Sequence, residues 1–154
     1  MRRWSVLLVA AWLGAAVLTA AVVAPAAFDV LPTRTLAGAL VGRVLPVLFI
    51  SGAVVAAAYF AAVRTEPSTP RQRAMHLVLA IWVAALLWSQ LVVTPKIQVL
   101  RAAGPIDALA QTDPRRVAFG RLHGVSVGLL GVGMVAALVV LVWGPTVPTS
   151  RAGE

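Results

Sequence analysis

Residues 82–101, WVAALLWSQLVVTPKIQVLR, contain the end of a long apolar run. The run ends at Pro95, immediately before Lys96, which is the first basic residue after it. From Ala74 to Pro95 the chain contains no Asp, Glu, Lys or Arg. A run of about 20 such residues matches the hydrocarbon thickness of a bilayer at the rise of an α-helix. Because proline lacks the N–H that continues a helix, Pro95 predicts the end of a membrane helix.

Three further apolar runs complete the pattern. They predict membrane helices at about 4–25, 43–63, 74–95 and 122–143,. The sequence therefore predicts an all-α protein, an integral membrane four-helix bundle occupying residues 1–143. Residues 64–73, RTEPSTPRQR, predict a tight polar turn, and residues 144–154 predict a disordered C-terminal tail,.

The third run repeats the first, WLGAAVLTAAVVAPAAFDVL at residues 12–31, with an offset of 70 residues. The offset pairs Trp12 with Trp82 and Pro25 with Pro95. Two Gly-Arg pairs, at 42–43 and 120–121, precede the returning helices. A duplicated two-helix unit is one interpretation of this repeat, and chance similarity within an Ala/Val-rich chain is the alternative.

Composition and charge indicate the lipid bilayer, and not nucleic acid, as a partner of the chain. The chain is 60% hydrophobic and carries a net charge of +8, with its basic residues scattered beside apolar runs rather than gathered on one face. Basic residues distributed in this way are explained by their role in setting the membrane orientation and by contact with anionic headgroups, rather than by binding to nucleic acid. Basic residues near the first helix and in the 64–73 turn predict an inner (cell) membrane protein with both termini in the cytoplasm,.

Polar residues near the end of the bundle away from both termini form a candidate site. Its members are His123, Ser126, Arg121, Gln90, Arg43 and Asp29. In the functional interpretation His123 is a ligand or proton carrier, and it shares a helix face with Ser126. In the structural interpretation these groups satisfy carbonyls freed by Pro25 and Pro95, and we favour it.

A haem or metal site has few ligands to draw on. The chain has no cysteine, and its two histidines, His76 and His123, are predicted on opposite sides of the membrane. One iron cannot bridge them, so we predict no cofactor, with a single-histidine haem on His123 as the alternative.

Small residues recur at intervals of four, at Gly38 and Gly42 and at Gly120, Gly124 and Gly128. Such spacing brings helix backbones close together. It predicts tight packing inside the bundle, with a homo-oligomer through these helix faces as the alternative.

Several of these residues together resemble the transmembrane protein 205-like family, whose bacterial members carry a domain of unknown function. The motifs are Trp12-Leu13-Gly14, Ala24-Pro25, Phe28, Ala37-Gly38, Pro95, Arg101 and Phe119-x-x-Leu122-His123-x-x-Ser126. The resemblance spans about residues 5 to 140. It implies a four-helix membrane protein whose biochemical activity is not established.

From these observations we expect a non-enzymatic accessory or small-molecule-handling membrane module with an unknown ligand. The alternative is a haem- or metal-dependent membrane redox protein using His123. No transmembrane carboxylate is present for a proton or cation pump, and His123 and Ser126 lack the carboxylate of a hydrolytic triad,.

Overall fold

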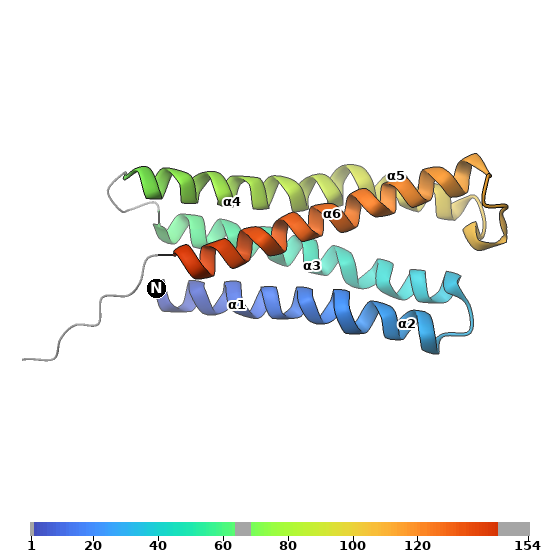
Figure 1. The fold of residues 1–154 in the computed structure, drawn as a ribbon, viewed down its shortest axis with the longest axis horizontal. Coiled ribbons are helices and arrows are strands. Elements are labelled where there is room, and N and C mark those ends of the chain that lie inside the picture. Colours follow the sequence, from blue (N-terminus) through green and yellow to red (C-terminus); the bar gives the residue numbers. More distant parts are fainter. Residues whose placement is uncertain (1, 64–68, 145–154) are drawn as a thin grey trace, which may run out of the picture.

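The computed structural model describes residues 2–63 and 69–144, and these residues form an antiparallel four-helix bundle (Figure 1). Within them, four helices are long and apolar enough to cross a membrane. The elements in chain order are α1 (Arg2–Leu18), η1 (Thr19–Val23), α2 (Ala24–Val30), α3 (Arg34–Val63), α4 (Pro70–Trp88), η2 (Ser89–Val93), α5 (Thr94–Ala102), η3 (Ile106–Ala108) and α6 (Pro114–Trp143). The chain is an integral membrane bundle, as the sequence predicts.

The helices alternate in direction and form a closed ring of neighbours. The continuous helix α1–η1–α2 packs beside α3 and α6, and the continuous helix α4–η2–α5 packs beside the same two. The start of α1 and the end of α6 lie at one end of the bundle, while the α2–α3 and α5–α6 connections lie at the other (Figure 1). The predicted tail lies outside the described residues except for Gly144. Residues 64–68, half of the predicted 64–73 turn, also lie outside them, and α4 already begins at Pro70 within the other half.

Pro25 and Pro95 do not end their helices, so that prediction was wrong. A five-residue π-helical turn, η1 or η2, stands immediately before the residue that precedes each proline. In these turns the N–H groups of Ala24 and Thr94 donate to the carbonyls five residues earlier. The wider turn accommodates a residue that lacks an N–H and whose ring would clash with an ordinary helical turn. The helices therefore continue to Val30 and Ala102.

The π-helical turns also bear on the repeat. Thr19 and Ser89 open the two turns, and they are separated by the same 70 residues as the prolines. Both side chains are buried. Local backbone structure is thus repeated along with the sequence.

The helices also begin earlier than predicted, because polar N-caps precede the apolar runs. The Thr33 hydroxyl accepts from the N–H of Leu36 at 3.2 Å, so α3 begins at Arg34 and not near Arg43. Thr69 and Asp113 cap α4 and α6 in the same manner, each followed by a proline at the first helical position. Proline is tolerated there because that N–H has no partner within the helix.

The core centres on two tryptophans. The rings of Trp12 on α1 and Trp82 on α4 have centroids 4.9 Å apart, and Trp12 Nε1 donates to the Leu48 carbonyl on α3 at 2.9 Å. A Cβ on Gly52 would stand 2.5 Å from Trp12 Cε2, and one on Gly133 would stand 2.9 Å from Leu86 Cδ2. Glycines on the returning helices therefore make room for this layer.

The outer surface is apolar. Leucine, valine and tryptophan side chains remain exposed along every long helix, among them Trp4, Val30, Leu91, Val135 and Val142. A soluble protein rarely exposes apolar surface so continuously, and a bilayer covers it. Gly120, Gly124 and Gly128 lie on α6 with open space where a Cβ would stand.

Candidate functional site

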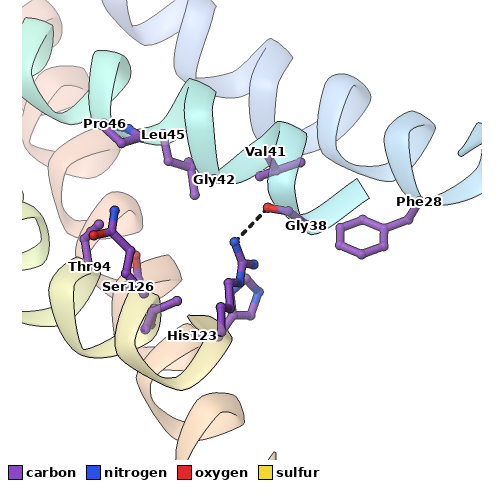
Figure 2. A pocket seen from close by; sticks show the side chains of 12 residues that line it. Phe28, Gly38, Val41, Gly42, Leu45, Pro46, Thr94, His123 and Ser126 are labelled. Atoms are coloured by element: carbon purple, nitrogen blue, oxygen red, sulfur yellow. Dashed lines mark hydrogen bonds between the residues drawn. The ribbon is translucent and has the colours of Figure 1, made fainter. Parts of the chain in front are cut away.

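Arg101 lies near the end of α5 and reaches across to α3. Its Nη1 donates to the carbonyl oxygen of Gly38 at 2.8 Å (Figure 2). A Cβ on Gly38 would stand 3.0 Å from Arg101 Nη2, and one on Gly42 would stand 2.7 Å from Nη1. Gly38 and Gly42, whose spacing predicts close packing of helix backbones, therefore make room for a guanidinium group.

Aromatic rings on α6 complete the surroundings of Arg101. The guanidinium carbon lies 5.3 Å from the centroid of the Phe119 ring, within the range of a cation–π contact,. The imidazole of His123 is stacked one turn further along, with centroids 6.0 Å apart and planes at 5°. Phe119 thus contacts both the Arg101 guanidinium and the His123 imidazole.

Two further arginines donate hydrogen bonds to backbone carbonyls of the α5–α6 connection. Arg115 donates to the carbonyls of Ala103 and Gly104 at 2.8 and 2.7 Å, and Arg116 donates to that of Leu109 at 2.6 Å. Gly104 has φ of +118°, a conformation that favours glycine,. These contacts fix η3, from which Asp107 accepts a 3.1 Å hydrogen bond from the Thr35 hydroxyl on α3.

Two adjoining cavities lie between these elements. The larger has a volume of about 430 Å³ and the smaller one about 70 Å³. Residues lining both are Phe28, Gly38, Arg101 and His123. The larger cavity is also lined by Arg34, Thr35, Ala39, Gly104, Pro105, Ile106, Asp107 and Phe119. The smaller extends toward the bundle centre, past Pro46 and Thr94 to Ser126 (Figure 2).

At the end of the smaller cavity that Ser126 lines, a pair of hydroxyl groups joins the π-helical turn η2 to α6. The Ser89 and Ser126 hydroxyl oxygens are 3.1 Å apart and buried. The Thr94 hydroxyl donates to the Ser89 carbonyl at 3.0 Å, within the same wide turn. This polar cluster closes the cavity on its inner side.

The structure brings some of the predicted site residues together and separates others. His123, an exposed side chain, and buried Ser126 line the small cavity, whereas exposed Arg121, Arg43 and Asp29 line neither cavity. Half-buried Gln90 also lies outside both linings, and its buried Oε1 has no hydrogen-bond partner within the described chain. Exposed Pro25 and Pro95 shape the helices that surround the site.

Arg101, Arg34 and Asp107 line the larger cavity but were absent from the predicted set. For Arg101 the sequence held only part of the signal, the Gly38-x-x-x-Gly42 pair, because the contact joins residues 63 apart. Arg34 and Asp107 could not be distinguished from other charges in the connections. Across the described residues, no three side chains of the metal-ligand types gather closely enough to hold an ion.

Charge at this end of the bundle is predominantly positive. Residues 24–43 and 94–123 carry seven basic and three acidic side chains. Two of the seven, Arg115 and Arg116, are engaged by backbone carbonyls of the connection. Arg34 and Arg101 are the basic residues that line a cavity.

Comparison with known proteins gives one match. Residues 7–105 match a family model described as a domain of unknown function (DUF4149), which covers the first three long helices and ends before η3. No curated protein and no solved structure matches the chain.

Proposed function

The chain belongs to the DUF4149 family, and from that premise we propose that it is a non-enzymatic membrane module that binds a small molecule in the larger cavity. In this proposal it is a multi-pass protein of the cell's inner membrane with both termini in the cytoplasm. We also propose that the chain is related to the transmembrane protein 205-like family. The cavity accordingly opens near the non-cytoplasmic surface.

The observation that carries this proposal is the convergence of different elements on one cavity. Phe28 comes from α2, Gly38 from α3, Arg101 from α5, Asp107 from η3 and His123 from α6. A volume of about 430 Å³ falls within the range of small-molecule sites,. An apolar wall with a few polar groups is typical of ligand binding.

Hydrogen bonding supports binding over catalysis. In the described residues His123 stacks on Phe119 and makes no hydrogen bond to a hydroxyl or carboxylate group. Asp107 accepts its hydrogen bond from Thr35 instead. Nucleophilic catalysis requires a base that contacts both a nucleophile and an orienting carboxylate.

Filling the cavity tests the proposal. Ala39 lines the cavity and Ala58 does not, and both are exposed positions on α3. We expect Ala39→Phe to remove small molecules that copurify with the protein, as identified by mass spectrometry of organic extracts, while Ala58→Phe retains them. The proposal fails if the two folded variants carry the same small molecules as the natural protein.

A further inference from the structure

The larger cavity has an excess of positive charge. Its charged lining residues are Arg34, Arg101 and Asp107, so two guanidinium groups face one carboxylate. The carboxylate of Asp107 already accepts a hydrogen bond from the Thr35 hydroxyl. The lining therefore favours an anionic ligand.

Hydrogen-bond donors remain available to that ligand. A guanidinium has five N–H donors, and Arg101 uses one of them toward Gly38,. Within the described chain, Arg34 makes no hydrogen bond and no ion pair. Arg115 and Arg116 differ, because their guanidinium groups hold the carbonyls of the connection.

Arg101 is also held in position before any ligand arrives. Gly38 and Gly42 leave space for its guanidinium on one side, and the Phe119 ring lies within cation–π distance on another. A planar, fixed guanidinium binds phosphate oxygens in a bidentate manner and loses little entropy on binding.

The position of the cavity matches lipid headgroups. Each of α3 and α6 has 30 residues and so extends about 45 Å, roughly 15 Å beyond the hydrocarbon core,. The cavity lies among the first turns of α3 and α6, beside the polar connections. Phe28, 47% exposed at the cavity wall, offers an apolar surface to an acyl chain or glycerol backbone.

We propose that the cavity binds a phosphate group between Arg101 and Arg34, in the form of an anionic phospholipid headgroup or a free phosphate. This inference rests on the proposed function and names the class of ligand for the same cavity. His123 and Phe28 form its sides, and Asp107 excludes a second negative charge beside Thr35.

Native mass spectrometry of the purified full chain tests this inference. Phosphatidylglycerol and phosphatidylcholine are added at equal concentrations, and their adducts are compared with and without inorganic phosphate. The variants are Arg34→Gln, which removes a cavity charge, and the control Arg43→Gln, which removes an exposed charge on the same helix outside the cavity. Arg101→Lys keeps the charge but removes the planar pair of donors.

We expect the natural protein to prefer phosphatidylglycerol by about fivefold or more, the effect of one basic residue near an anionic surface. Arg34→Gln should lower that preference about fivefold and Arg101→Lys should also lower it, whereas Arg43→Gln leaves it unchanged. Displacement by inorganic phosphate identifies free phosphate as the ligand, and persistence of the lipid adduct identifies the headgroup.

Two results would overturn the inference: equal adducts of the two lipids, or equal losses in Arg34→Gln and Arg43→Gln. The second result would mean that general surface charge attracts the lipid. If Ala39→Phe removes an adduct that shows no anionic preference, the proposed binding function survives and only the phosphate assignment fails.

Discussion

Trp12 and Trp82 meet in the core with ring centroids 4.9 Å apart and planes inclined by 49°. They are equivalent positions of the sequence repeat, on α1 and α4, which lie diagonally across the bundle. Both rings are buried. The repeat thus supplies the central contact of the bundle, and that contact depends on glycines in the two returning helices.

Gly52→Ala should destabilise this layer. Its Cβ would stand 2.5 Å from Trp12 Cε2, so the ring or the helix must shift, at a typical overpacking cost of about 1–3 kcal/mol,. Thermal unfolding in detergent measures the effect. Gly128→Ala is the matched control because its Cβ meets open space, and it should leave stability unchanged or slightly higher,. Equal melting temperatures for the two variants would contradict this packing.

The four-helix fold could be predicted from the sequence because uncharged runs of bilayer length are a strong and local signal. The behaviour of Pro25 and Pro95 could not, because proline usually stops a helix and only the backbone reveals the π-helical turn that precedes it,. The sequence also identified the end of the bundle that holds the cavity, through His123 and Ser126.

The central role of Arg101 was missed for a different reason. Its partner is a backbone carbonyl 63 residues away, and a carbonyl leaves no mark in the sequence. Gly38 and Gly42 carried part of the signal, but the same spacing is common where helix backbones pack together.

The Ser89–Ser126 hydrogen bond should contribute a coupling free energy of about 0.6–1 kcal/mol, the usual size of such contacts between membrane helices,. Unfolding of Ser89→Ala, Ser126→Ala and the double variant gives this value from a double-mutant cycle. Ser51 bonds only the carbonyl of its own helix, at Leu48, and Ser51→Ala serves as the control. Strictly additive effects of the two serine substitutions would mean that the hydroxyls do not interact.

The orientation of the protein can be measured by cysteine labelling, since the natural chain has no cysteine. In the chain Ser68 falls between the second and third long helices and Thr112 between the third and fourth, so single cysteines at these positions should react from opposite sides of the membrane. With both termini in the cytoplasm, Thr112→Cys reacts with an impermeant reagent added outside the cell, and Ser68→Cys requires permeabilisation. The reverse pattern would invert the orientation, and labelling of both from one side would contradict four spans.

An optical spectrum tests the redox alternative directly. We expect the purified protein to show no Soret band, because His123 is stacked on Phe119 and the cavity it lines is the proposed small-molecule site. A Soret band that disappears in His123→Ala, with the protein still folded, would favour a haem protein instead.

The central claim is that the cavity beside Arg101 holds a ligand, and an experimental structure of the protein in nanodiscs containing phosphatidylglycerol tests it most directly. We expect non-protein density in this cavity within hydrogen-bonding distance of the Arg101 guanidinium and next to Phe28. A cavity containing only water, or one closed by the side chains of α3 and α6, would contradict it.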